Sequence, residues 1–444
     1  MSVITGGPAG RTAYLNARLL DPASGLDTVG DLLTVGGEIA DLGPGLFKDG
    51  APPDAAVVDC AGGCLAPGLV DMRVQLREPG DEHKETIKTA SAAASAGGVT
   101  AMVCLPDTNP PIDDVAVLEF IARRAREVRG TKVFCYGAAT RGLQGTQLTE
   151  MGLLSETGAV AFTDGGRAIA NAQVMRRALL YAGTFDALLV QHPQEPTLAK
   201  DGDMNAGEVA LRLGLSGIPA VGEVMMIERD LRLAESTGGR YHAAHISTAA
   251  AVEAIRAAKA RGLRVTCDTA PPYFTLNETA VGDYRTFAKL DPPLRAEADR
   301  EAIVEGLADG TIDVIASDHS PHDQDSKRLP FAQAEFGIVG LETLLPLSLA
   351  LVHKGRMGLN ALLACLTVKP AELLGLPLGR LAKGAPADLV LFDLDRPWRI
   401  DPDQFRSKSK NSPFGDAPVQ GHALRTVVAG RPLFTFDNIT AAVA

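Results

Sequence analysis

The sequence predicts an α/β fold, a (β/α)8 barrel of the TIM type joined to a small β-sandwich domain built from both ends of the chain. The middle of the chain alternates strand-like and helix-like segments in eight steps, which favours a closed barrel over an open sheet. Both ends carry short strand-like segments separated by turns. A length of 444 residues accommodates both units. We expect residues 1–66 and 376–444 to form the sandwich and residues 67–375 the barrel.

The strands of the barrel are expected where short apolar runs precede helical patterns. The first run is followed by an alanine-rich helical segment near residues 84–97, and the later runs repeat this alternation. In the end segments, the turn at Gly430 separates two strand-like halves of residues 424–436. The expected barrel strands are 69–76, 100–105, 133–138, 160–163, 188–191, 241–245, 264–268 and 313–317.

Composition excludes several classes of protein. The chain is 46% hydrophobic and 22% charged, which is typical of a globular protein. A net charge of −11 gives no indication of a nucleic-acid surface. No apolar run reaches membrane-spanning length, no signal-peptide pattern opens the chain, and the six scattered cysteines suggest buried thiols. We therefore expect a cytoplasmic protein without nucleic-acid or membrane partners.

The stretch 66–80 is a buried strand that runs into a polar loop. Side chains on a strand alternate with a period of two, so Asp71, Arg73 and Gln75 share one face. Further polar residues follow most of the other expected strands. Because a barrel carries its site at the carboxyl ends of its strands, these residues indicate a functional site there. They are Arg77, Asp107, Asn109, Asp164, His192, His245, Asp318, His319 and His322.

Several of these stretches together resemble the dihydroorotases, a family of the amidohydrolase superfamily. The resemblance extends over nearly the whole chain and implies the same fold, with a zinc-dependent interconversion of carbamoyl aspartate and dihydroorotate as the family activity. The stretches with the clearest resemblance are Leu76-Arg77-Glu78-Pro79-Gly80, Leu105-Pro106-Asp107-Thr108-Asn109-Pro110-Pro111, Phe162-Thr163-Asp164-Gly165, His245-Ile246-Ser247-Thr248, Asp291-Pro292-Pro293-Leu294-Arg295, Ala316-Ser317-Asp318-His319-Ser320-Pro321-His322 and Phe336-Gly337-Ile338-Val339-Gly340-Leu341-Glu342-Thr343.

The resemblance also assigns roles to single positions. Three family metal ligands are present as His192, His245 and Asp318, and Asp318 is also the family's general base. The other metal-ligand positions hold Arg73 and Gln75, where the family has histidines, and Gly165, where it has a carboxylate. The family's substrate-binding positions correspond to Arg77, Asp107, Asn277 and His322, with Asp107 replacing an asparagine.

These replacements weigh against efficient catalysis. Bound zinc lowers the pKa of water from about 15.7 to about 7, so without it the hydroxide fraction falls by roughly eight powers of ten. A carboxylate acting alone as a general base contributes only about 10²–10⁴-fold. Two histidines and one carboxylate can still hold a single zinc ion. Arg73 opposes this because it places a permanent positive charge beside the site, and we expect it to contact Asp318 instead.

Three hypotheses remain open. The first is a catalytically degenerate dihydroorotase-like chain that needs no cofactor and acts as a structural partner of aspartate carbamoyltransferase, as similar chains in some bacteria do. The second is a working dihydroorotase, or a related cyclic amidohydrolase, with zinc at a reduced single-metal site. The third is a binding protein for a small acidic ligand that uses Arg77 and His322. A homo-oligomer is expected in each case.

Overall fold

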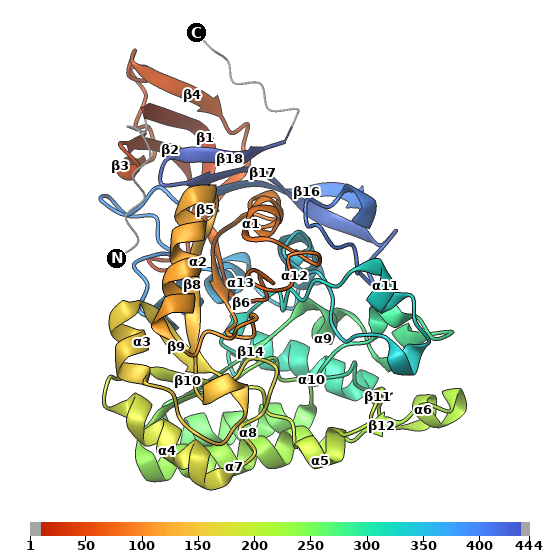
Figure 1. Cartoon of the computed structure of the whole chain (residues 1–444). Coiled ribbons are helices and arrows are strands. Elements are labelled where there is room, and N and C mark those ends of the chain that lie inside the picture. The colour runs from red at the N-terminus through yellow and green to blue at the C-terminus, as the bar shows by residue number, and fades with distance from the viewer. Residues whose placement is uncertain (1–9, 437–444) are drawn as a thin grey trace.

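Eight parallel strands form the centre of the structure, a computed structural model that describes residues 10–436. They follow one another around the sheet in chain order, as the alternation in the sequence predicts (Figure 1). The sheet is nearly closed, because Val74 at the end of the first strand bridges His319 beyond the last and the Gln75 amide donates to the His319 carbonyl at 2.9 Å. The strands are β6 (Leu69–Val74), β7 (Val99–Cys104), β8 (Lys132–Ala138), β9 (Ala159–Thr163), β10 (Leu188–Gln191), β13 (Arg240–Ala243), β14 (Val265–Thr269) and β15 (Val314–Ile315).

Helices cover the outside of this barrel (Figure 1). Several begin at a residue whose side chain accepts a hydrogen bond from an amide of the first turn, as with Thr86, Asp114, Asn171 and Thr248. Such a cap satisfies a donor that the helix itself leaves free. The main helices are α1 (Ile87–Ala96), α2 (Val115–Val128), α3 (Met151–Thr157), α4 (Ala172–Gly183), α7 (Val221–Thr237), α8 (Ala249–Ala260), α10 (Glu297–Ala308), α12 (Leu344–His353), α13 (Leu359–Leu366) and α14 (Val368–Leu373).

Short helices and strands lie within the loops, and most of them are not predicted by the sequence. A short helix at Glu208–Leu213 lies between two strands that pair with each other in a separate two-stranded sheet. Two-residue strands carry too little periodicity to be recognised from sequence. These elements are β11 (Met204–Asn205), α6 (Glu208–Leu213), β12 (Gly217–Ile218), α5 (Pro196–Ala199), α9 (Pro271–Thr275), α11 (Gln324–Lys327), η1 (Arg141–Leu143), η2 (Glu278–Val281), η3 (Thr286–Ala288), η4 (Phe331–Gln333) and η5 (Pro402–Gln404).

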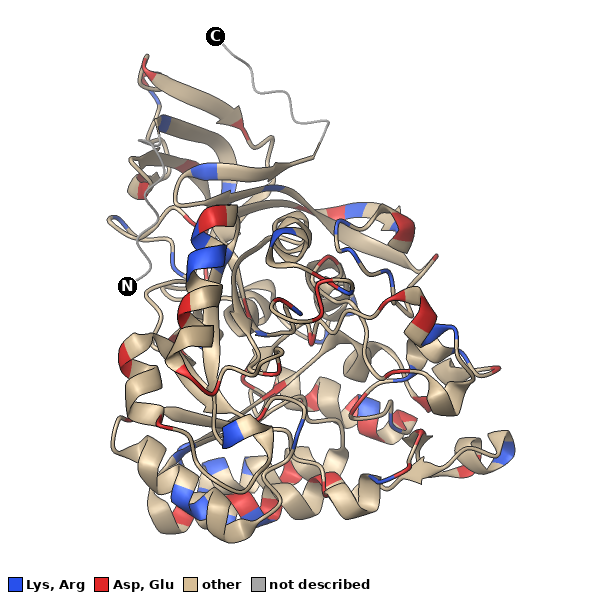
Figure 2. Cartoon of the chain, viewed as in Figure 1, with Lys and Arg blue, Asp and Glu red and all other residues tan. Residues whose placement is uncertain are grey.

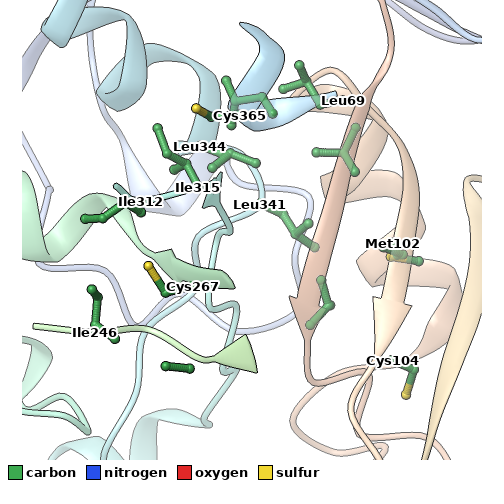
Figure 3. Close-up of a cluster of buried hydrophobic side chains, with 14 of the residues drawn as sticks. Leu69, Met102, Cys104, Ile246, Cys267, Ile312, Ile315, Leu341, Leu344 and Cys365 are labelled. Carbon is green, nitrogen blue, oxygen red and sulfur yellow. The ribbon is translucent and has the colours of Figure 1, made fainter. Parts of the chain in front are cut away.

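Apolar side chains fill the space between the strands and the surrounding helices. Figure 3 shows part of this core, in which Leu69 and Met102 come from neighbouring strands and Leu344 from α12. All six cysteines are buried free thiols, as predicted, and Cys267 and Cys365 lie in this same cluster. The core therefore fixes the strands whose ends carry the polar residues.

Strands from both ends of the chain pair in one mixed sheet (Figure 1). The sheet branches at its first strand, which pairs with three others. The two halves meet where the fifth strand pairs antiparallel with β16. The division of the chain at 66/67 and 375/376 stays our proposal, and its residues 1–9 and 437–444 lie outside the described range. The strands are β1 (Arg11–Asp21), β2 (Leu26–Val35), β3 (Glu38–Gly43), β4 (Ala55–Asp59), β5 (Cys64–Pro67), β16 (Leu389–Arg399), β17 (Pro418–Val428) and β18 (Arg431–Thr435).

Charged residues of both signs are interspersed along the outer helices in the view of Figure 2. Within residues 10–436, no helix is both long enough and apolar enough to cross a membrane.

Phe392 of β16 connects the terminal sheet to the barrel core, because it is fully buried in the cluster that contains the barrel side chains. We expect Phe392→Ala to lower the free energy of unfolding by about 3–5 kcal/mol, the usual cost of deleting a buried aromatic side chain. Thermal unfolding followed by circular dichroism measures this. Val29→Ala is the control, since Val29 is 70% exposed and should change the midpoint little. Equal midpoints for the two variants would contradict the assigned packing.

Candidate functional site

An arginine on the first barrel strand lies against a carboxylate that follows the last strand. Arg73, 4% exposed, points into the end of the barrel where the strands finish, which we call the mouth. Its Nε donates to Asp318 Oδ1 at 2.7 Å. The alternation of β6 predicted this inward direction, and the predicted contact is confirmed. The ion pair is only partly shielded, because the Asp318 side chain is 16% exposed.

Two buried histidines continue from the same carboxylate. Asp318 Oδ2 lies 3.1 Å from His245 Nδ1, and His245 Nε2 lies 2.7 Å from His192 Nδ1. On the far side, His192 Nε2 is 3.7 Å from Asp291 Oδ2. A single chain of polar contacts thus runs from Arg73 to Asp291 across the mouth.

The environment shifts the pKa values of these groups in opposite directions. Burial by itself raises the pKa of Asp318, but the charges of His245 and Arg73 outweigh it and hold that pKa well below its usual range. Burial, followed by the effects of His245 and Arg73, lowers the pKa of His192 well below its usual range, so this imidazole is neutral. Burial raises the pKa of Asp291. The mouth therefore carries an ionised Asp318 that is already neutralised by its neighbours.

Two buried carboxylates hold the backbone of the site. Asp71 Oδ1 accepts the amides of Arg73 and Ser317, each at 3.1 Å, and thereby links the first strand to the segment that carries Asp318. Asp268 Oδ1 accepts the His245 amide at 2.8 Å. Arg77, His245 and Asp318 all have positive φ values, of 60°, 37° and 51°. Such backbone persists only where the surroundings enforce it, which is typical of functional sites.

Gln75 lines the mouth beside the ion pair of Arg73 and Asp318. Its Nε2 donates to Asp107 Oδ2 and its Oε1 accepts from Ser320 Oγ. Gly165 lies near Asp107, since a Cβ at position 165 would be 3.5 Å from the Asp107 Cβ. Three of the altered family positions therefore lie close together, and two of them, Gln75 and Asp107, are hydrogen-bonded to each other.

Arg77 and His322 lie together at the rim. Arg77 Nη2 is 3.3 Å from Ser320 Oγ and 3.2 Å from His322 Nε2, and Arg77 Nε is 3.3 Å from the Pro321 carbonyl. Among residues 10–436, no carboxylate forms a salt bridge with Arg77. Burial and then the charge of Arg77 lower the pKa of His322 to about 2, so its ring is neutral. An anion is the ligand that this arrangement favours.

A cavity of about 260 Å³ opens above these groups. Two of its charged side chains have an unpartnered atom among the described residues, Nη1 of Arg73 and Oδ1 of Asp291. Buried polar atoms without a partner are costly, so such atoms indicate that the cavity takes up polar molecules. The residues of its wall that matter for this argument are Arg73, Arg77, Lys84, His245, Asp291 and His322.

The structure does not bring every expected residue to this cavity. Asn277 begins the short helix η2 and donates to Glu297 Oε2 at 2.7 Å, away from the cavity wall. Asp164 accepts the amide and hydroxyl of Thr140 instead of facing the cavity. His192 lies behind His245, and Asp107 reaches the cavity only through Gln75.

The three remaining family ligands do not fit a zinc ion as they are arranged. The two histidine nitrogens that face each other are 2.7 Å apart and hydrogen-bonded, so neither is free to bind a metal. The Arg73 guanidinium covers Asp318 Oδ1. Over the described residues, no group of three or more His, Cys, Asp or Glu side chains is placed to hold a metal. Binding zinc would require His192 to turn and Arg73 to withdraw.

Sequence reasoning missed two contributors to the site. Asp291 stands in a stretch quoted for its resemblance, but the resemblance assigned it no role, and the structure places it in the cavity wall. Asn411 comes from the loop before β17 and accepts the His322 amide at 3.1 Å. Nothing local in its sequence marks it, because its partners are far away in the chain.

The fold and the mouth together define a protein of the amidohydrolase class. The Amidohydrolase family model matches residues 221–433, and the Dihydro-orotase-like model matches residues 62–251. An L-hydantoinase (dihydropyrimidinase) from Arthrobacter aurescens superimposes with a TM-score of 0.85 at 26% identity, covering 97% of each chain. A dihydropyrimidinase from Brevibacillus agri NCHU1002, at 21% identity and a TM-score of 0.82 over 96% of this chain and 95% of that one, shows the fold alone.

Closer relatives in sequence are dihydroorotases. The dihydroorotase of Anaplasma phagocytophilum (strain HZ) is 49% identical over 98% of this chain and 98% of its own. That of Syntrophotalea carbinolica is 49% identical over 95% of this chain and 99% of its own. This chain belongs to the dihydroorotase family.

Replacing Arg73 should lower the stability of the fold, because it removes the cation that neutralises the Asp318 carboxylate. We expect Arg73→Met to destabilise the fold, by less than the about 3–5 kcal/mol typical of a fully buried pair because Asp318 retains some exposure. The double variant Arg73→Met/Asp318→Asn should recover part of this loss, since neither charge remains. Denaturant unfolding of all the variants measures both effects.

The stability that the Arg73–Asp318 pair contributes should depend on pH, and the lowered pKa of Asp318 fixes the direction. Because its partners lower the pKa of Asp318, their stabilisation is complete above the usual carboxyl pKa of about 3.9 and is lost as the pH falls below it. The difference in the free energy of unfolding between wild type and Arg73→Met should therefore become smaller as the pH falls. Arg18→Met breaks the exposed pair with Asp27 and is the control, with little effect expected. A difference in the free energy of unfolding that stays constant or grows as the pH falls would contradict the assigned pairing.

Proposed function

We propose that this chain is a dihydroorotase-family protein of pyrimidine biosynthesis in which zinc-dependent catalysis has been lost. The observation that carries the proposal is the 2.7 Å bond from Arg73 to Asp318, the family's metal ligand and general base. An arginine side chain stays charged at every physiological pH, so a divalent cation would have to displace it against electrostatic repulsion. It supplies neither a Lewis acid nor a bound water of lowered pKa.

The competing candidate is a working dihydroorotase with zinc at a reduced site. The comparisons favour it more than the degenerate alternative, because the relatives reported above are named dihydroorotase at 49% identity over nearly their full length. His192, His245 and Asp318 supply enough ligands for one zinc ion if the side chains rearrange. Whether this chain is an enzyme therefore depends on whether a metal can replace Arg73.

A small acidic molecule is the ligand that we propose for the mouth in either case. The side-chain partners of Arg77 are uncharged groups, and Lys84, whose Nζ lies 3.8 Å from Asp81 Oδ2, adds a further positive charge to the cavity wall. The cavity of about 260 Å³ is large enough for a compact dicarboxylate but too small for a polymer.

For a catalytically degenerate chain, we propose that the outer surface supplies the function, as a structural partner of aspartate carbamoyltransferase. The support is the resemblance to degenerate family members together with a fold that is complete despite the altered site. A homo-oligomer of this chain is part of the same proposal.

The deciding experiment measures zinc content and turnover on one preparation purified without chelators. We expect zinc well below one ion per chain, and no conversion of dihydroorotate or carbamoyl aspartate above the uncatalysed rate. Near-stoichiometric zinc, with turnover that chelation removes and Asp318→Ala abolishes, would overturn the proposal and establish the competing candidate.

Restoring histidines at the altered metal-ligand positions also tests whether the mouth is a former zinc site. We expect Arg73→His/Gln75→His to raise bound zinc, because the substitution removes the cation and adds two imidazoles. Arg73→Met/Gln75→Met removes the cation without adding ligands and should gain none. Turnover should stay low even in the histidine variant, since Gly165 and Asp107 also depart from the family pattern. Equal zinc in both variants would show that the mouth is not a vacated metal site.

Co-expression with the aspartate carbamoyltransferase of the same organism tests the partner. We expect one joint peak in gel filtration at micromolar concentration, with the chain present in a fixed ratio. Two independent peaks would refute the partnership, and a chain that then elutes as a monomer would refute self-association as well.

A further inference from the structure

A segment of the terminal region reaches across to the barrel mouth. Residues 405–412, which we call the strap, lie between η5 and β17. Ser407 Oγ and the Lys408 amide both donate to Glu85, which precedes α1, and Ser409 Oγ donates to the Lys84 carbonyl at 2.7 Å. The strap is therefore fixed to the first loop of the barrel, beside a residue of the cavity wall.

Near its end the strap carries a buried asparagine whose side-chain amide is fully hydrogen-bonded. Asn411 is 2% exposed. Its Oδ1 accepts the His322 amide at 3.1 Å, while its Nδ2 donates to the carbonyls of Ser320 at 2.9 Å and Gly337 at 3.0 Å. One acceptor and two donors in this arrangement match a side-chain amide, whereas a carboxylate would face two carbonyl oxygens.

The loop that Asn411 holds is the one that contacts Arg77. Residues 318–322, the site loop, present Ser320 Oγ and His322 Nε2 within 3.3 Å and 3.2 Å of Arg77 Nη2. The loop also has contacts to other parts of the mouth, because the Gln75 amide donates to the His319 carbonyl at 2.9 Å and the Ser320 amide donates to Ile338 at 2.7 Å. Loss of Asn411 should consequently displace the outer end of the site loop without unfolding the barrel.

We propose that Asn411 is a positioning residue for the anion pocket at the mouth, acting through the site loop to set Ser320 and His322 against Arg77. The terminal region thus shapes a site whose other residues all come from the barrel. The role of Asn411 rests on the proposed acidic ligand only in the binding experiment below. The measurement of the His322 conformation requires neither a bound ligand nor turnover.

The conformational test follows the imidazole of His322 by NMR in histidine-labelled protein, with the signal assigned by His322→Gln. The variants are Asn411→Asp, which keeps the shape and removes both donors, and Asn411→Ala, which adds no charge. Asn360→Asp is the matched control, because Asn360 Nδ2 also donates to a backbone carbonyl, that of Leu26, but far from the mouth.

In the wild type and in the control, burial and the charge of Arg77 should keep His322 neutral from pH 5 to pH 8, in line with its lowered pKa. In both Asn411 variants the released ring should gain solvent, and its titration should move into that range. Folded Asn411 variants whose His322 does not titrate would overturn the proposal. Failure of both variants to fold would also overturn it, because the role of Asn411 would then be structural.

The binding test uses carbamoyl aspartate and succinate as probes in isothermal titration calorimetry. We expect the Asn411 variants to bind the better probe about tenfold more weakly than wild type, the change produced by one lost hydrogen bond of ordinary strength. Asn360→Asp should bind as the wild type does. Unchanged affinity in the Asn411 variants would overturn the positioning role. If the wild type binds neither probe, the acidic-ligand function fails, and the His322 titration alone decides the role of Asn411.

Discussion

The ion pair between Arg73 and Asp318 determines what the mouth of this barrel can do. A buried carboxylate requires a counter-charge or several hydrogen-bond donors, because its transfer from water is otherwise too costly. Here an arginine and a histidine meet that requirement from within the chain. With the charge of Asp318 balanced in this way, the demand that draws a metal ion into such a site is already satisfied.

The remaining contacts of the mouth follow from that balance. Gln75 and Asp107 bond to each other beside the pair, which leaves Arg77 as the guanidinium without an acidic partner in the cavity wall among residues 10–436. The backbone behind them is held by buried carboxylates such as Asp71, whose pKa burial raises to about 7. Hydrogen bonds thus hold the backbone of the site, while several of its side chains differ from the family pattern, so family membership and activity are separate questions for this chain.

Sequence identity to the relatives and the geometry of the site report on different parts of the chain. Identity of 49% to dihydroorotases reports the whole chain, most of which maintains the barrel and its core. Catalysis depends on a handful of side chains, and single replacements there outweigh any number of matching core residues. The comparisons therefore establish the family and favour an enzyme, while the geometry of Arg73 argues against the family's chemistry at this mouth.

The sequence by itself determined the order of elements, the inward face of the first strand and the contact of Arg73 with Asp318. The order of elements and the inward face of the first strand follow from local periodicity. The contact of Arg73 with Asp318 required, in addition, the resemblance that places Asp318 at the family's metal site. Only the tertiary structure decided that Asn277 lies away from the cavity, that Asp291 lies in its wall and that Asn411 reaches it from the terminal region. The physical reason is that these positions depend on where irregular loops cross the mouth. Loops have no repeating pattern, and their course is set by hydrogen bonds to residues distant in the chain.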